Sequence, residues 1–160
     1  WIRDLAHELH PAEIEEIGLA SALSEYCSEL ASATDVDVEW AISEDVCSIP
    51  KELSINFYRV AQEALTNALR HAHPGRVTVR LSSENESLVL EVVDDGKGFR
   101  KPGPVSGRLP SGLGLVGMRE RANMLRANLD ISSEPGQGTR VRLSVPIEGL
   151  GCREYDAEDA

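Results

Sequence analysis

The apolar residues of this chain repeat with two different periods, and the order of these periods constrains the fold more than any other feature. Helical spacing, with apolar residues three or four positions apart, covers residues 2–10 and again 14–30. Between residues 35 and 42 the period shortens to two, because apolar residues alternate there with acidic ones. The chain is therefore predicted to begin with helices, with Pro11 ending the first, and to continue into a strand that has one polar face.

A long helix and a pair of strands are predicted next. The helix should open at Pro50, in a first-turn position, and run to about His73, where Pro74-Gly75 stops it. The strands cover residues 76–81 and 88–93, and the polar turn between them is slightly longer than the shortest hairpin loops. The alternation of both segments indicates a β-hairpin.

The last part of the chain is separated from this hairpin by a stretch rich in glycine and proline. Residues 96–114 hold six glycines and three prolines, which favours a mobile loop. A helix is predicted over about 115–127, followed by strands at 129–133 and 139–145. The whole order predicts an α/β (α+β) two-layer sandwich, in which helices cover one face of a mixed, mostly antiparallel sheet.

Composition limits the possible partners. The chain has 160 residues, 41% of them hydrophobic, which suits one domain with one core. Its net charge of −11 argues against wrapping nucleic acid or binding an anionic membrane surface. A nucleotide would need a local site made of backbone N–H groups, a few basic side chains or a metal. The three cysteines are widely spaced and form no CxxC pair, so free thiols in a reducing compartment are expected.

The long helix carries a first polar cluster. Glu63, Asn67, Arg70 and His71 follow at positions i, i+4, i+7 and i+8, at the edge of its apolar face. A carboxylate and an amide one turn apart offer oxygen ligands that suit Mg²⁺, and the basic residue beyond them suits phosphate oxygens. A polar stripe that merely borders a packed face would have the same pattern.

A second cluster stands at the end of an apolar strand, in the sequence Asp94-Asp95-Gly96-Lys97-Gly98-Phe99. A carboxylate at a buried strand end can accept a hydrogen bond from an exocyclic amine, and glycines let the backbone approach a ring closely. An EF-hand calcium loop needs more alternating acidic positions than this segment has. A plain Asp-Gly turn remains the alternative.

A third cluster, residues 111–118, places glycines at the start of the last predicted helix. Exposed N–H groups at a glycine-rich helix start can bind phosphate. Gly112, Gly114 and Gly117 also match the dinucleotide fingerprint G-x-G-x-x-G, but residues 108–111 before them do not form the strand that this fingerprint requires. The dinucleotide interpretation is therefore rejected.

Taken in order, these clusters resemble the ATPase domain of the GHKL superfamily, shared by gyrase-type topoisomerases, 90 kDa heat-shock chaperones, mismatch-repair ATPases and histidine kinases. The match is closest to the catalytic domain of the sensor histidine kinases that pair with LuxR-type response regulators. The segments that resemble its N box, G1 box, G2 box and closing strand are FYRVAQEALTNALRHA, LEVVDDGKGF, SGLGLVGMRERANML and SSEPGQGTRVRLSVP. The resemblance covers residues 1–147 and implies a Bergerat-type ATP-binding fold.

The resemblance also implies roles for individual residues. Asn67 would hold Mg²⁺, with Glu63 beside it orienting the metal or a water, and Arg70 and His71 would face the phosphates and the ribose. Asp94 would accept the adenine amine. The remaining positions implied to bind the nucleotide are Gly96 and Gly98 beside the ring, Gly112 and Gly114 in a lid over the phosphates, and Thr139 in support of Asp94.

The start of the chain lacks a convincing phosphate acceptor. In the family this acceptor is a histidine in a continuous helix, followed by an acidic residue. His7-Glu8 begins such a motif, but Pro11 interrupts it only four residues later. Residues 1–33 instead resemble connector helices at the end of a dimerisation hairpin, residues 34–147 the ATP-binding domain, and 148–160 an acidic tail expected to be disordered. Because the chain begins with Trp1, we expect a fragment of a longer, homodimeric protein.

The resemblance implies an ATP- and Mg²⁺-dependent protein histidine kinase, cytoplasmic even if its parent is membrane-anchored. Its γ-phosphate would pass to a histidine outside the fragment and then to the receiver domain of a response regulator. Two alternatives stay open. One is a nucleotide-regulated binding module without transfer activity, and the other is an ATP hydrolase in which Glu63 activates water.

Overall fold

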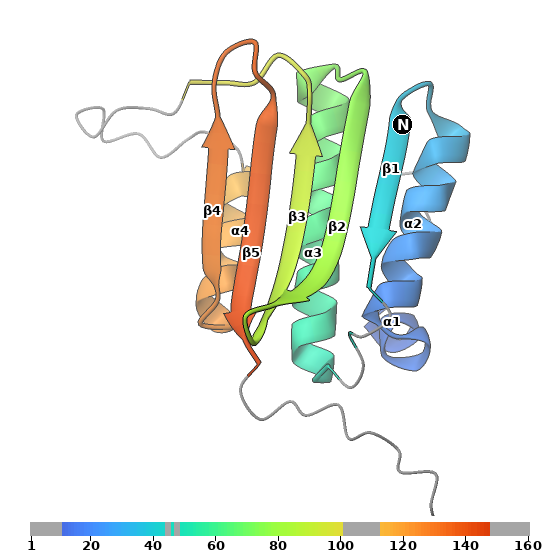
Figure 1. Ribbon diagram of the computed structural model, residues 1–160, viewed down its shortest axis with the longest axis vertical. Coiled ribbons are helices and arrows are strands. Elements are labelled where there is room, and N and C mark those ends of the chain that lie inside the picture. Colours follow the sequence, from blue (N-terminus) through green and yellow to red (C-terminus); the bar gives the residue numbers. More distant parts are fainter. Residues whose placement is uncertain (1–10, 44–45, 47–48, 101–112, 148–160) are drawn as a thin grey trace, which may run out of the picture.

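The computed structural model describes residues 11–43, 46, 49–100 and 113–147, and it has two layers (Figure 1). One layer is a sheet of five strands in the order β1-β2-β3-β5-β4, in which β1 is parallel to β2 and all other pairs are antiparallel. The helices cover one face of this sheet. The strands are β1 (Asp37–Ile42), β2 (Arg76–Glu84), β3 (Ser87–Asp94), β4 (Asn128–Ser133) and β5 (Thr139–Pro146). The helices are α1 (Pro11–Ile17), α2 (Leu19–Ala33), α3 (Lys51–Asn67), the π-helix η1 (Ala68–Ala72) and α4 (Leu113–Met124). The predicted fold class is confirmed.

The side chains on the inner face of the sheet form rows that cross all five strands. Cross-strand partners share a face, so the pairing register defines each row. The first row is Ile42, Leu81, Leu90, Leu143 and Leu129, and the second is Trp40, Val79, Val92, Val141 and Ile131. The third row begins with Val38 and Val77 but continues with Asp94, Thr139 and Ser133. One end of an apolar face therefore turns polar over β3, β5 and β4.

The helices bury their apolar faces on these rows. The long helix α3 supplies a run of buried side chains, among them Phe57, Val60, Ala61, Ala64 and Leu65. Burying one such Leu or Phe side chain fully stabilises the fold by about 1.5–3 kcal/mol. The helices α1 and α2 belong to the same core, because Ile14, Leu23 and Leu30 are almost fully buried in it. The predicted domain boundary at residue 33 therefore runs between elements that share one core, and it stays a prediction.

The first helices can be compared with the sequence prediction only from Pro11 onward. Pro11 begins α1, which agrees with the tolerance of a helical first turn for proline. The single helix expected over 14–30 is interrupted at Gly18, whose φ of 83° favours glycine. The predictions for residues 2–10 and 148–160, including His7, lie outside the described residues.

The hairpin between β2 and β3 is tighter than predicted. Both strands extend by pairing Glu84 with Ser87, which leaves only Asn85 and Glu86 in the turn. Both residues have positive φ, 48° and 57°, as the two-residue turns that match the strand twist require. The prediction of a longer polar loop was wrong, because the polar residues after Leu81 continue the hydrogen-bonded pairing of β2 with β3.

The long helix ends as predicted near His73, but its last turn is a π-helix. Residues 68–72 form η1, and His73 follows with a left-handed φ of 49°. A π-turn advances each residue by a smaller rotation than an α-turn, so residues after Asn67 leave the face that α-helical periodicity assigns to them. This matters for Arg70 and His71.

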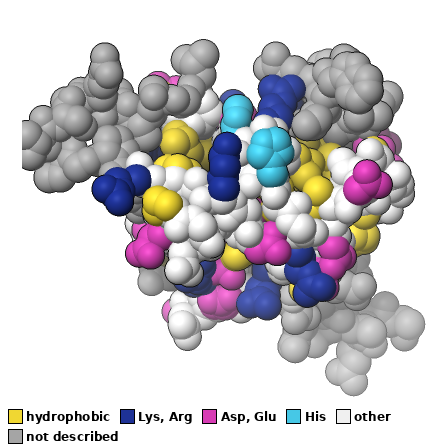
Figure 2. Space-filling view, turned by 90° about the horizontal axis from the view of Figure 1, so that it is seen from above, with side chains coloured by type: hydrophobic (Ala, Val, Ile, Leu, Met, Phe, Trp, Pro, Cys, Tyr) yellow, Lys and Arg dark blue, Asp and Glu magenta, His cyan; other side chains and the backbone are white. Residues whose placement is uncertain are grey.

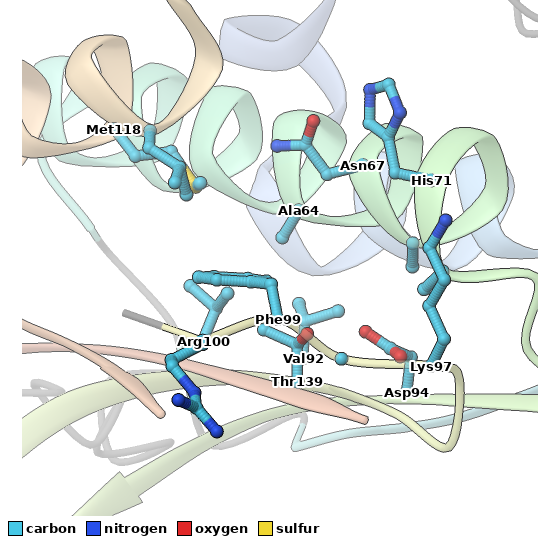
Figure 3. Close-up of a pocket in the computed structure, with 15 residues that line it drawn as sticks. Ala64, Asn67, His71, Val92, Asp94, Lys97, Phe99, Arg100, Met118 and Thr139 are labelled. Carbon is cyan, nitrogen blue, oxygen red and sulfur yellow. The ribbon is translucent and has the colours of Figure 1, made fainter. Parts of the chain in front are cut away.

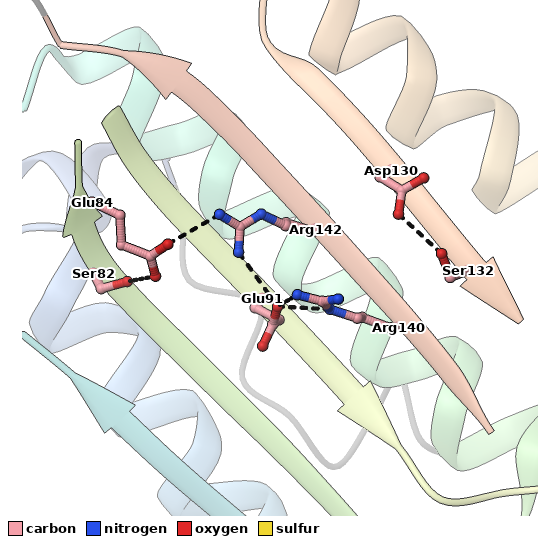
Figure 4. A network of polar contacts seen from close by, with 7 residues as sticks. All are labelled: Ser82, Glu84, Glu91, Asp130, Ser132, Arg140 and Arg142. Carbon is pink, nitrogen blue, oxygen red and sulfur yellow. Dashed lines mark hydrogen bonds and ion pairs between the residues drawn. The ribbon is translucent and has the colours of Figure 1, made fainter. Parts of the chain in front are cut away.

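The outer face of the sheet is held by charged pairs (Figure 4). Glu91 on β3 pairs with Arg140 and Arg142 on β5, and Arg142 also reaches Glu84 on β2 at 3.0 Å. These side chains are partly exposed, so each pair adds only about 0.2–1 kcal/mol. None of the helices in the described part of the chain is long and apolar enough to cross a membrane.

Candidate functional site

A cavity of about 460 Å³ lies where the polar end of the sheet meets α3 and η1 (Figure 3). One wall comes from α3 and η1, and the other from the ends of β3 and β5 with the loop after β3. Of the residues predicted to bind a cofactor, five line it: Asn67, His71, Asp94, Gly98 and Thr139. The first two clusters thus meet at one site together with Thr139, and the third contributes Leu115 and Met118 but none of its predicted glycines among the described residues.

Asp94 is the buried polar group at the floor of this cavity, with 6% of its surface exposed. Its Oδ1 accepts the N–H of Gly96 at 2.9 Å, and Thr139 is its partner across β3 and β5. Burial raises the pKa of Asp94 above its ordinary value, and hydrogen bonding to Gly96 and Thr139 partly opposes that rise. A carboxylate held in this way is an acceptor aimed at a hydrogen-bond donor that enters the cavity.

The neighbouring Asp95 behaves in the opposite way. It is exposed, and its Oδ1 accepts the backbone N–H groups of Gly75 at 2.8 Å and Arg76 at 2.9 Å. The bond from Arg76 is the main reason that the pKa of Asp95 is lowered. Asp95 therefore holds the start of β2, whereas Asp94 faces the cavity.

Close backbone packing fixes the loop that follows Asp94. A Cβ added to Gly96 would lie 2.5 Å from the Cβ of Ala72, and one added to Gly98 would lie 2.1 Å from the Glu134 carbonyl oxygen. Lys97 lies between these glycines, and its backbone donates to the Ala72 oxygen at 2.9 Å and accepts from the Gly136 N–H at 2.7 Å. The loop is thus clamped between η1 and the turn that joins β4 to β5.

The opposite wall carries Asn67 and Glu63, one turn apart on α3. The amide nitrogen of Asn67 donates to Glu63 Oε1 at 3.2 Å, so the Asn67 oxygen is left to bind another partner. Glu63 does not line the cavity itself but reaches α4, where a Cβ on Gly114 would lie 1.8 Å from its Oε1. A side chain at position 114 would displace this carboxylate, so Gly114 lets α4 lie against Glu63 in its present conformation.

The side-chain oxygens of Asn67 and Glu63 suit a cation that is also coordinated by oxygen atoms of a bound ligand. Within the described ranges, no three side chains of His, Cys, Asp or Glu are grouped so that they could hold a metal by themselves. Mg²⁺ is commonly held by only one or two protein oxygens together with waters and phosphates. Asn67 and Glu63 offer such a pair, so the residues present fit Mg²⁺.

The basic residues of the first cluster are separated in the structure. His71 lines the cavity, whereas Arg70 is exposed and does not. Both residues are exposed and lie in η1, where the rotation per residue is smaller than in an α-helix, so the α-helical spacing that grouped them with Asn67 does not apply there. Gly112, predicted to lie in a lid, falls outside the described residues.

The other residues that line the cavity include Lys97, Phe99, Arg100 and Met118, for which no role was predicted from the sequence. The first three belong to the segment that follows Asp94, so their position between and after the two glycines was the available signal. Figure 3 shows Lys97 and His71 on the same side of the cavity. Figure 2 shows histidine and basic side chains on this face, with acidic side chains among and below them. His71, Lys97 and Arg100 are the basic side chains that line the cavity and could contact an anionic ligand.

Comparisons with known proteins agree with this geometry. A model of the family of histidine kinase-, DNA gyrase B- and HSP90-like ATPases matches residues 52–149. The sensor histidine kinase LiaS of Bacillus subtilis (strain 168) is 35% identical over 158 residues, which are 98% of this chain but only 42% of LiaS. The chain thus spans less than half of this relative.

Solved structures share the fold. The histidine kinase domain of the blue-light activated histidine kinase of Erythrobacter litoralis EL346 superposes with a TM-score of 0.69 at 24% identity, covering 82% of this chain and 62% of that domain. Histidine kinase AdeS of Acinetobacter baumannii gives a TM-score of 0.58 at 16% identity, covering 79% of this chain and 61% of that one. At these identities the likeness concerns the fold alone.

Proposed function

This chain belongs to the family of histidine kinase-, DNA gyrase B- and HSP90-like ATPases, and from this premise we propose that it is the ATP-binding catalytic domain of a sensor histidine kinase. The observation that carries the proposal is the buried Asp94 carboxyl, which faces a cavity whose other wall presents Asn67 and His71. A buried acceptor suits the amine of adenine, and the polar helix wall suits the phosphates. The kinase assignment within the family rests on the likeness to LiaS.

In this proposal the two walls bind different parts of ATP. The adenine amine donates to Asp94, while Gly98 and Phe99 allow the ring to lie close to the loop. Asn67, with Glu63 beside it, holds Mg²⁺ on the phosphate side. Bound Mg²⁺ supplies neutralisation of the charge on the phosphate oxygens. His71 and the exposed Arg70 would face the ribose and phosphates. The lid role predicted for Gly112 and Gly114 stays a prediction, since Gly112 lies outside the described residues.

The transfer itself would be catalysed mainly by positioning. The γ-phosphate moves to an imidazole nitrogen, and the chain's own groups hold the donor in line and balance its charge. We expect this imidazole to come from outside the sequence. A residue before proline is disfavoured in the helical region, so the sequence disfavours a continuous acceptor helix that includes both His7 and Pro11. The phosphate would then pass to a response regulator receiver domain, and the whole protein would be a homodimer.

Radiolabelled ATP tests this proposal. The isolated chain should bind Mg-ATP yet gain no acid-labile, alkali-stable phosphate, and a longer protein that contains the upstream helices should become labelled. Labelling of the isolated chain that His7→Gln abolishes would place the acceptor inside it. Absence of any ATP binding would refute the proposal as a whole.

ATP hydrolysis is the second candidate, favoured by the position of Glu63. Its carboxylate lies beside Asn67 and Gly114, on the side of the cavity assigned to the phosphates, where it could activate a water. A kinase domain without its acceptor should release almost no inorganic phosphate. Steady turnover that Glu63→Gln abolishes would favour the hydrolase over the kinase.

A further inference from the structure

Ser133, at the end of β4, lies behind the adenine end of the cavity. It continues the third inner row of the sheet, because Asp94 pairs with Thr139 and Thr139 pairs with Ser133. The three side chains therefore share one face across three adjacent strands. Ser133 is half-buried and is not part of the cavity wall, so it can act on a ligand only through its neighbours.

The Ser133 hydroxyl has three partners. Its Oγ accepts the backbone N–H of Phe99 at 2.9 Å. The same oxygen lies 3.0 Å from the carbonyl oxygen of Gly138 and 3.1 Å from Thr139 Oγ1. One serine thus connects the loop after β3, the turn between β4 and β5, and the hydroxyl that contacts Asp94.

The direction of these bonds follows from the number of hydrogens. A serine or threonine hydroxyl has one hydrogen to donate. The Ser133 hydrogen can go either to the Gly138 carbonyl oxygen or to Thr139 Oγ1. When it goes to Thr139, the Thr139 hydrogen is left to point toward the carboxylate of its cross-strand partner Asp94, and the chain of donation runs from Ser133 to Thr139 to Asp94. When Ser133 donates to Gly138 instead, Thr139 must turn toward Ser133 to keep their contact, and Asp94 loses this hydroxyl donor.

We propose that Ser133 is a positioning residue for adenine recognition, which orients the Thr139 hydroxyl toward Asp94 and holds the backbone of Phe99 at the cavity. The inference rests on the proposed binding of ATP. Connected hydroxyls polarise one another, so a Thr139 hydroxyl that accepts from Ser133 is a better donor to Asp94. Burial raises the pKa of Asp94, and donors to the charged form oppose this effect. Ser133 thereby helps to keep a charged acceptor for the adenine amine.

The test compares ATP with purine riboside triphosphate, which lacks the 6-amino group, by calorimetric titration of the chain. The wild type should prefer ATP, and Ser133→Ala should reduce this preference by about 3- to 30-fold, the range for one or two lost hydrogen bonds. Ser133→Thr keeps the hydroxyl and should retain most of the preference. A merely structural role would lower the affinity for both nucleotides alike.

Ser132→Ala is the matched control. Ser132 is the adjacent residue on the same strand, but its hydroxyl donates to Asp130 at 3.0 Å on the outer face of the sheet (Figure 4). This variant should retain the wild-type preference. If Ser133→Ala does not fold, Ser133→Cys keeps a similar shape with a much weaker hydrogen-bonding group, and it should also reduce the preference.

The outcomes separate this inference from the proposed function. A folded Ser133→Ala or Ser133→Cys variant that keeps the full wild-type preference overturns the role of Ser133 alone, since ATP binding would stand. A wild type that binds both nucleotides equally overturns the assignment of Asp94 together with that of Ser133. A wild type that binds neither overturns the proposed function itself.

Discussion

The two walls of the cavity are built in different ways. On the sheet side, backbone groups hold the loop after Asp94, since Lys97 is bonded to both Ala72 and Gly136, and Gly98 touches Glu134. On the helix side, Asn67 and His71 project from α3 and η1, whose own hydrogen bonds do not depend on these side chains. Substitutions on the sheet side should therefore change the fold and the binding together, whereas those on the helix side should change binding alone.

The largest expected effect tests the sheet wall with a matched pair of glycines. Gly138 and Gly136 have nearly the same φ, 76° and 78°, but a Cβ would lie 1.9 Å from the Asp94 carbonyl oxygen at Gly138 and would meet nothing within 4 Å at Gly136. Gly138→Ala should lower the free energy of unfolding by about 3 kcal/mol or more, and Gly136→Ala by about 1 kcal/mol. Denaturant unfolding measures both. Equal losses would show that the close packing of this turn is not what holds the loop.

Asp94→Asn tests the same wall without disturbing its backbone. The amide presents a weaker acceptor or a donor to adenine, so affinity for ATP should fall about 10- to 100-fold, or about 1–3 kcal/mol. The preference for ATP over GTP should be lost with it. Asp95→Asn is the control, because the Asp95 carboxylate accepts from the backbone of Gly75 and Arg76 and does not line the cavity, so the ATP affinity of this variant should stay near the wild-type value. If the two variants bind ATP equally well, Asp94 does not recognise the base.

The pH dependence of binding should follow the same carboxyl. Burial raises the pKa of Asp94 above its ordinary 3.8, so Asp94 becomes protonated at a higher pH than an exposed aspartate. As pH falls through this raised pKa, ATP affinity should decrease, approaching about tenfold for each further unit. The sign is opposite for folding, because a raised pKa favours the folded state at low pH and that contribution is lost as pH rises. ATP affinity should be measured for wild type and Asp94→Asn from pH 7 to pH 4. Only the wild type should show the loss of affinity that comes from protonation of Asp94.

The helix wall should respond to the metal. Asn67→Ala removes an oxygen ligand on the phosphate side but leaves Asp94 and its neighbours untouched, so affinity for Mg-ATP should fall roughly tenfold. Affinity for ATP measured in EDTA should change little, and the free energy of unfolding should stay within about 0.5 kcal/mol of wild type. A variant that responds to Mg²⁺ as the wild type does would exclude Asn67 as a ligand.

The positions in the sheet wall follow local sequence rules most directly. Asp94, Gly96 and Gly98 lie within five residues of one another, at a strand end and at close backbone approaches, although their roles in binding stay predictions. Ser133 could not be found in this way, because its role depends on the pairing of β4 with β5. That register joins residues whose meeting is not encoded by any local spacing.

On the helix wall, α-helical periodicity predicts the side-chain positions only as far as Asn67. Glu63 and Asn67 lie one turn apart as predicted and do meet. Extending the same 100° step to Arg70 put it beside them, but the chain changes to a π-helix at Ala68, and Arg70 is exposed instead. Nothing in the local sequence signals this change, since the residues of η1 would also suit an α-helix.

The smallest expected effect is a difference in ATP affinity between variants of Lys97 and Arg70. Lys97 lines the cavity in the structure, although no role was predicted for it from the sequence. No carboxylate of the described residues pairs with it, so Lys97→Met should lower ATP affinity about two- to fivefold, as expected for an exposed charge. Arg70→Met should have less effect in the isolated chain. Salt decides whether the cause is electrostatic, because screening at 0.5 M NaCl should remove most of the difference between wild type and Lys97→Met. Adenosine, which has no phosphate, should bind both proteins equally. If Arg70→Met lowers ATP affinity more than Lys97→Met does, η1 changes its geometry when ATP binds. The α-helix predicted from the sequence would then describe residues 68–72 in the ATP-bound state better than the π-helix does.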